Sequence, residues 1–483
     1  MADDFEWLDA TAQAELVRAG DVTPAELVDS ALARIDDRNP ALNAVIHDLS
    51  DKARAAAADP ALPDGLFRGV PFLLKDAVAH SAGDPYHCGM QVLKDAGWVE
   101  NDDTWLVERF RAAGFVICGK TNLPELASTV TTEPRAYGPT RNPWDLSRSP
   151  GGSSGGAAAA VASGMVAVAH GNDMGGSIRF PSSMCGLVGL KPSRGRSTLG
   201  PDFGEYWAMT THEHVLTRSV RDSAGVLDAI AGAGTGDPYT APPPARPFLA
   251  EVGAETGRLR IGFRTECTGG LGPAHPDCVA AVAATAAALE SLGHHVAPDP
   301  ITALDHPRFG EAVPSLFGVF IAGDLDRWSE KLGRAVTPAD VEPWNGMLAE
   351  MGAATTAVAY ARAIEKLQAY CRGVAQWWDD GNDILVTPML TEPPFELGWL
   401  GPEVDPFEAL GRLSGVTSFS MPFNATGQPA ISLPLHWNDD GLPIGVQLVA
   451  AYGREDVLLR VARQLEAALP WADRHPSVSS SSS

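Results

Sequence analysis

Apolar runs alternate with amphipathic stretches along most of the chain, and this pattern predicts strands that alternate with helices. Short uninterrupted apolar runs are typical of buried strands, whereas apolar residues three or four positions apart are typical of helices. The predicted strands are 69–76, 114–122, 258–263, 383–390, 429–435 and 443–451. The predicted helices are 23–37, 104–114, 155–164, 215–232, 277–293 and 455–469. We therefore expect an α/β fold with one large mixed sheet that helices cover on both faces.

Local signals mark the limits of some elements. Thr23, Pro24 and Glu26 have the pattern of a capping box with proline at the first helical position, which predicts a helix start there. The proline-rich segment 237–247 predicts a loop, and 305–380 is expected to be mostly helical although its boundaries are weakly marked.

Composition narrows the classes of function. The chain has 483 residues, 45% of them hydrophobic, and a formal net charge of −24. No basic cluster interrupts this negative charge, so we expect no binding to nucleic acid, whose phosphates require a basic face. No uncharged, glycine-free apolar run approaches the roughly 18 residues of a membrane span, and the acidic start lacks the pattern of a signal peptide. We expect a cytoplasmic protein that does not bind membranes.

The spacing of cysteines and histidines gives no sign of a metal site. The six cysteines are scattered and form no CxxC pair. Two of them, Cys118 and Cys185, lie in apolar runs and are expected to be buried thiols. Because no set of Cys and His residues has ligand spacing, we expect no metal.

Two glycine-flanked serine clusters are the most unusual feature of the sequence. The first, GGSSG at 151–155, fits the G-x-S-x-G nucleophile elbow, but the residues before it read as a loop instead of the required strand. It also lacks the lysine of a phosphate loop, since Ala157 follows Gly156. A flexible linker would explain this cluster alone, but it would leave the second one unexplained.

The second cluster, MGGS at 174–177, is suited to holding an oxyanion. Glycines let neighbouring backbone N–H groups converge on one point without obstruction by Cβ atoms. Converging N–H groups are what an oxyanion hole requires. Ser177 is therefore a candidate nucleophile, with the amides of Met174, Gly175, Gly176 and Ser177 as candidate donors.

A serine nucleophile needs a base, and no histidine stands out as one. The alternative is a neutral lysine, because burial lowers the pKa of an amine. Three lysines follow apolar runs: Lys75, Lys120 and Lys191. Spacing alone does not choose among them, and each also reads as a lysine that extends from the end of a strand to water.

Long motifs in a fixed order resemble those of the amidase signature family. They are GVPFLLKD (69–76), GKTNLPELA (119–127), GPTRNPWDLSRSPGGSSGG (138–156), GNDMGGSIRFPSSMCGLVGLKPSRGR (171–196), PFNATGQPAISLP (422–434) and GLPIGVQLV (441–449). The resemblance implies the amidase signature fold and amide hydrolysis by a Ser–cisSer–Lys triad, with no cofactor. By motif, Ser177 is the acylated nucleophile, Lys75 the base and Ser153 the bridging serine after a cis peptide bond. Ser154, Asp173 and Arg179 are implied to brace the loop.

Departures from the family pattern bear on the substrate. The family often has Thr where this chain has Asn172, and amidotransferase subunits often have Gln where it has Phe180. The second departure disfavours an amidotransferase A-type subunit. Both ends of the chain are most similar to the branch that contains 6-aminohexanoate-cyclic-dimer hydrolase and aryl-acylamidase-like enzymes. This implies an amidase for linear or cyclic amides, including nylon-type ω-amino-acid oligomers; an aryl acylamidase or urethanase is the alternative.

The resemblance also implies how the chain is organised. We expect one domain over 1–476, with a catalytic core at about 65–235, and a disordered serine-rich tail at 477–483. The segment at about 300–420 varies in such enzymes and is expected to select the substrate. A small-molecule or oligomeric amide is the expected partner, and a homodimer is left open. Expected substrate-binding residues are Ala127, Phe317 and Phe423.

Overall fold

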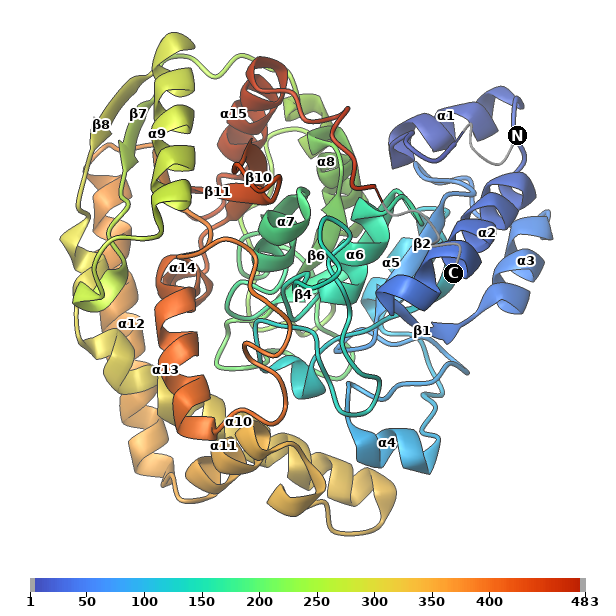
Figure 1. Cartoon of the computed structure of the whole chain (residues 1–483), viewed down its shortest axis with the longest axis horizontal. Coiled ribbons are helices and arrows are strands. Elements are labelled where there is room, and N and C mark those ends of the chain that lie inside the picture. Colours follow the sequence, from blue (N-terminus) through green and yellow to red (C-terminus); the bar gives the residue numbers. More distant parts are fainter. Residues whose placement is uncertain (1–4, 478–483) are drawn as a thin grey trace.

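One mixed sheet runs through the computed structural model, which describes residues 5–477; the tail predicted at 477–483 thus lies almost wholly outside the described residues. The sheet has the strand order β1-β3-β2-β4-β6-β5-β10-β11-β9-β7-β8 (Figure 1). Its strands are β1 (Val45–Asp48), β2 (Pro71–Lys75), β3 (Val116–Thr121), β4 (Val168–Asp173), β5 (Val188–Lys191), β6 (His212–Thr217), β7 (Arg260–Phe263), β8 (His295–Pro298), β9 (Ile384–Pro388), β10 (Ala430–Trp437) and β11 (Pro443–Ala450).

Both parallel and antiparallel pairs occur in this sheet. β2 pairs in parallel with β3 and β4, and β7 pairs in parallel with β8 and β9. The strands between these two groups pair antiparallel, as do β1 and β3. The predicted mixed α/β sheet is therefore confirmed. Because β2 lies between two parallel neighbours, its carboxyl end, at Lys75, is enclosed by the ends of β3 and β4.

Fifteen α-helices of the described residues pack around the sheet. Thr23 caps α2 in the predicted capping box, in which its side chain and that of Glu26 each bond the other's backbone N–H. The helices are α1 (Ala10–Ala19), α2 (Pro24–Leu42), α3 (Ser50–Ala58), α4 (Gln91–Ala96), α5 (Trp105–Ala112), α6 (Gly155–Ala162), α7 (Arg179–Cys185), α8 (Val220–Ile230), α9 (Pro276–Ser291), α10 (Arg308–Leu332), α11 (Pro343–Ala353), α12 (Ala357–Asp379), α13 (Pro406–Val416), α14 (Met421–Thr426) and α15 (Glu455–Ala468).

The helices of the middle of the chain form a layer of their own. Figure 1 shows α10, α11 and α12 along the lower left edge of the molecule, away from α1 and α2. Within this layer α10 packs against both α11 and α12. No helix among residues 5–477 combines the length and apolar character that crossing a membrane requires.

The expected helix at 215–232 is wrong in its first residues. Val215 to Thr217 are the end of β6, and the helix begins at Val220, where the Ser219 side chain accepts a hydrogen bond from the Asp222 amide. An apolar strand end runs directly into a helix here, so the two patterns merge into one amphipathic stretch. Strands β1, β4, β5, β6 and β8 were not predicted, because they are short or contain Gly, His and Asp.

Two glycines set the contact between α10 and α11, and this contact yields a stability prediction. A Cβ added at Gly352 would lie 1.9 Å from the Gly318 carbonyl oxygen, so Gly352→Ala must push the helices apart. We expect a loss of about 1–3 kcal/mol, the range for overpacking a core. Gly323→Ala on α10 is the matched control, because nothing lies within 4 Å of its new Cβ. Thermal melting of both variants checks this; equal melting temperatures would contradict it.

Candidate active site

The three candidate lysines have different surroundings, and only Lys75 contacts the serine clusters. Its Nζ lies 2.7 Å from Ser153 Oγ, 3.0 Å from Ser154 Oγ and 2.5 Å from Asn172 Oδ1. Lys120 pairs with the Asp76 carboxylate at 2.6 Å, and Lys191 donates to the Gln428 carbonyl at 2.6 Å. All three lysines are fully buried. Burial therefore does not distinguish them, but the contacts do.

The loop that carries Ser153 is tightly packed. The Gly152–Ser153 peptide bond is cis, as the resemblance implied. A Cβ at Gly152 would lie 2.6 Å from the Thr131 carbonyl oxygen, and one at Gly156 would lie 2.5 Å from the Asn122 amide nitrogen. The glycines of this cluster thus allow the close approach of backbone that brings Ser153 to the end of β2.

The hydrogen bonds around Lys75 can be satisfied by a neutral amine. Asn172 Nδ2 donates to the Ala77 carbonyl at 3.1 Å, which turns Oδ1 toward Lys75 as an acceptor. The Ser154 hydroxyl donates to the Asn172 carbonyl at 3.3 Å, so its oxygen accepts from Lys75. If the amine is neutral, these two acceptors take its two N–H bonds, and its lone pair is left to accept the Ser153 hydroxyl proton across the 2.7 Å contact.

Burial makes the neutral form of this lysine accessible near neutral pH. It lowers the pKa of Lys75 to about 7, although the nearby Glu213 carboxylate opposes part of this effect. A base whose pKa lies near the working pH transfers protons most efficiently. The cluster of Lys75, Ser153 and Ser154 can therefore accept a proton from a serine nucleophile.

The Asp173 carboxylate organises the turn that presents Ser177. It accepts hydrogen bonds from the amides of Gly176 at 2.8 Å and Ile178 at 3.2 Å, and from Arg179 Nε at 2.9 Å. Burial alone would raise the pKa of Asp173, but the Arg179 guanidinium outweighs it and holds that pKa well below its usual range. Asp173 and Arg179 thus brace the turn, and the Ser154 amide donates to the Ser177 carbonyl at 3.2 Å.

This arrangement corrects one of the four amides expected in the oxyanion hole. Gly176 donates its N–H to Asp173, so this amide faces away from a substrate. Its φ of +140° and a Cβ position 2.3 Å from the Phe180 ring require glycine, so its role is conformational. Among the described residues, the amides of Met174, Gly175 and Ser177 donate to no protein acceptor, and these three stay as candidate donors.

Ser177 lines a largely apolar cavity of about 650 Å³. Met174 and Gly175 lie beside it, and walls come from α10, α11 and α13. The two carboxylates on the lining are already paired: Asp305 with Arg264 at 2.7 Å, and Glu311 with Lys366 at 2.7 Å. The cavity therefore offers no unpaired carboxylate to bind a charged substrate.

Two of the three predicted substrate residues line this cavity, and the third does not. Ala127 and Phe317 are on its wall. Phe423 is fully buried on α14, where its ring packs edge-on against Trp378, 6.4 Å between centroids. It faces the core instead of the cavity, and Met421, two residues earlier, lines the cavity in its place. The expectation for Phe423 is therefore wrong.

Several residues of the candidate site could not be found from the sequence. Asn172 was noted only as a departure from the family pattern, and nothing in the sequence showed that it contacts Lys75. Trp207 lines the cavity from a loop with three consecutive positive φ values, and packs against Phe317 at 4.9 Å. The cavity residues of α11 and α13, such as Met347 and Leu413, had no signal at all.

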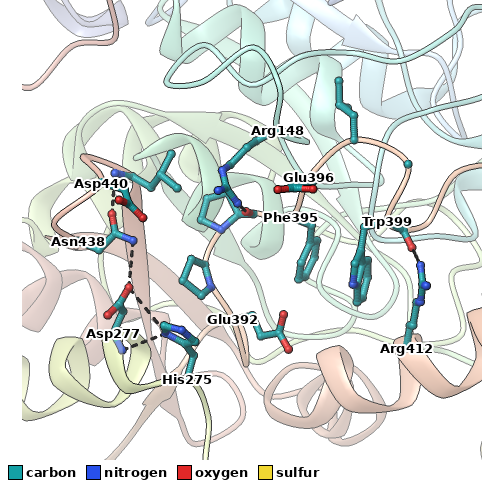
Figure 2. A pocket seen from close by; sticks show the side chains of 15 residues that line it. Arg148, His275, Asp277, Glu392, Phe395, Glu396, Trp399, Arg412, Asn438 and Asp440 are labelled. Carbon is teal, nitrogen blue, oxygen red and sulfur yellow. Dashed lines mark hydrogen bonds and ion pairs between the residues drawn. The ribbon is translucent and has the colours of Figure 1, made fainter.

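A second hollow, of about 580 Å³, is polar and excludes the serine clusters (Figure 2). Three of its polar groups lie together: Asn438 donates to Asp277 at 3.0 Å, and His275 lies 3.7 Å from the same carboxylate. The Arg412 guanidinium bonds the Trp399 carbonyl. None of these groups contacts Lys75, Ser153 or Ser177, so the hollow is not part of the candidate site.

Comparison with known proteins shows the family to which the chain belongs. The family model described as Amidase matches residues 26–459. The chain belongs to the amidase family. It is therefore a hydrolase of carbon–nitrogen bonds in amides.

Individual relatives of this amidase match over nearly the full length. The 6-aminohexanoate-cyclic-dimer hydrolase of Paenarthrobacter ureafaciens is 44% identical over 485 residues, which are 98% of this chain and 97% of that protein. A structure of 6-aminohexanoate cyclic dimer hydrolase complexed with substrate has a TM-score of 0.94 at 44% identity, covering 98% of this chain and 99% of that one. A bacterial aryl acylamidase structure has a TM-score of 0.84 at 26% identity, covering 96% and 97%.

The contact between Asn172 and Lys75 yields a prediction for the pH profile of this amidase. Asn172→Asp places a negative charge beside the amine, which favours the ammonium form and raises the pKa of Lys75. The acid limb of kcat/KM should therefore move to higher pH. Asn172→Thr, the residue common in the family, adds no charge and should leave the limb nearly in place. The paired profiles check this; a limb that stays put in Asn172→Asp would contradict the proposed contact.

Proposed function

We propose that the chain hydrolyses neutral amides with bulky alkyl or aryl groups through an acyl-enzyme on Ser177. The observation that carries this proposal is the 2.7 Å contact between Lys75 Nζ and Ser153 Oγ beside an apolar cavity that Ser177 lines. A buried neutral amine, a bridging hydroxyl and a second serine are the parts of a proton relay. No metal or cofactor takes part in the steps below.

In this mechanism Ser177 Oγ attacks the amide carbonyl carbon. Its proton passes to Ser153, whose own hydroxyl proton passes to Lys75, so that Lys75 becomes the ammonium. The amides of Met174, Gly175 and Ser177 donate to the developing oxyanion. The carbon–nitrogen bond then breaks as the relay returns the proton to the leaving nitrogen. Water, deprotonated by the same relay, attacks the acyl ester on Ser177 and releases the acid.

The cavity favours substrates that are uncharged near the scissile bond. Its lining is mostly apolar, and an apolar pocket selects by shape and volume. Amides of 6-aminohexanoate, cyclic or linear, are the first candidates, supported by the 44% identity to the cyclic-dimer hydrolase. Anilides and aryl carbamates are the second, supported by the aryl acylamidase structure at a TM-score of 0.84.

The mechanism yields a prediction for the nucleophile. A fluorophosphonate probe should label Ser177, because an activated serine beside an oxyanion hole attacks phosphorus. Ser177→Ala should abolish labelling and lower kcat/KM by about a thousandfold or more. Peptide mapping by mass spectrometry identifies the labelled residue. Label on Ser153, or label that persists in Ser177→Ala, would overturn the assignment.

The cavity yields a prediction for the substrate. The chain alone, with no second protein, should hydrolyse members of a panel: 6-aminohexanoate cyclic dimer, its linear oligomer, an acyl-anilide, an aryl carbamate and glutamine. We expect turnover of the bulky amides and none of glutamine, because the cavity has no unpaired carboxylate for its ammonium group. Cleavage of glutamine alone would contradict the bulky-amide proposal. Cleavage of anilides with an untouched cyclic dimer would favour the second candidate class.

A further inference from the structure

Three buried carboxylates surround Lys75, and two of them are paired with cations. Asp76 lies 2.6 Å from Lys120, and Asp173 lies 2.8 Å from Arg179. The third, Glu213 on β6, is 1% exposed and contacts only a histidine, through His170 Nε2 at 2.6 Å. The charges of the first two are largely cancelled at close range, whereas that of Glu213 is not.

The hydrogen bonds of His170 define its protonation. The backbone amide of Lys75 donates to His170 Nδ1 at 3.3 Å, and a backbone amide can only donate. Nδ1 therefore carries no proton, and the proton on Nε2 is donated to Glu213. The ring is neutral, so it orients the carboxylate without cancelling its charge. Glu213 Oε1 has no hydrogen-bond partner among residues 5–477.

Burial disfavours the charged forms of the other titratable groups around this pair. Burial lowers the pKa of His214 to about 3 and holds that of His212 well below its usual range. Burial likewise lowers the pKa of Lys191 on β5 far below its usual value. On the other side of Lys75, burial raises the pKa of the Cys88 thiol, which stays protonated. Glu213 is thus the one uncancelled charge among the described groups that act on Lys75.

We propose that the Glu213 carboxylate, oriented by His170, is the positioning group that keeps Lys75 basic enough to accept the proton relayed from Ser177. Burial on its own favours the neutral amine and so opposes protonation of Lys75. Glu213 lies opposite Asn172 in the pairing of β4 with β6, and Asn172 contacts Lys75 Nζ at 2.5 Å, so the carboxylate lies close to the ammonium that forms during acylation. Its negative charge stabilises that ammonium and is the largest charge opposing the effect of burial. The same pair holds the β2 backbone at Lys75. This inference rests on the proposed role of Lys75 as the base.

The test compares pH profiles of variants at position 213. Glu213→Gln removes the charge and keeps an acceptor for His170; Glu213→Thr is a second neutral variant suited to a strand. In both, the acid limb of kcat/KM on an acyl-anilide should move to lower pH by about half a unit to one unit. Glu213→Asp keeps the charge, so the acid limb of kcat/KM should stay at its wild-type pH. Asp324→Asn is the control, because Asp324 is a buried carboxylate that does not act on Lys75. In this variant too the acid limb should stay at its wild-type pH.

A second readout separates this inference from the proposed substrate. The rate of fluorophosphonate labelling of Ser177 depends on the same base and needs no amide. If the wild-type chain hydrolyses no amide of the panel, the pH profile of the labelling rate still has an acid limb, and its shift between variants can still be measured. An unmoved limb in every folded neutral variant would overturn the inference. So would a loss of rate and of thermal stability without movement, since that is the result of a merely structural role.

Discussion

The burial of one amine governs the rest of the site. Lys75 is fully buried, and its partners are two hydroxyls and an amide oxygen, none of them a negative charge. An ammonium in such surroundings is costly, so the surroundings favour the neutral base. A neighbouring carboxylate could favour the ammonium instead, but each of them is paired with a cation, with the exception of Glu213. The balance between burial and this one charge decides whether Lys75 can take part in catalysis.

The fold creates these surroundings because the ends of three neighbouring strands lie side by side. β2 lies between β3 and β4, so the residue at its carboxyl end is shielded from water by both neighbours. The end of β4 supplies Asn172 and Asp173, which bind Lys75 and the turn before Ser177. The glycine-rich loop before α6 closes the site from the other side with Ser153. The cavity beside Ser177, in contrast, is walled by α10, α11 and α13, so a different layer of the fold forms it.

The sequence predicted the mixed sheet, most helices and the motif residues, because long apolar patterns and family motifs are local properties. It did not choose among Lys75, Lys120 and Lys191 without the resemblance, because all three follow apolar runs. The role of Asn172 and Glu213 depends on which strands are neighbours, and no local pattern encodes that. Phe423 was misplaced for the same reason: its helix turns one face to the core and the face with Met421 to the cavity.

The most direct test of a neutral Lys75 is its own titration. The chain has only seven lysines, so selective ¹³C labelling at lysine Cε gives few NMR signals, and the signal missing from Lys75→Arg identifies Lys75. The account predicts that this signal titrates with a midpoint near 7, as burial of the amine requires. A midpoint near the unperturbed lysine value of about 10.4 would contradict the account, because Lys75 would then be an ammonium at the pH of catalysis.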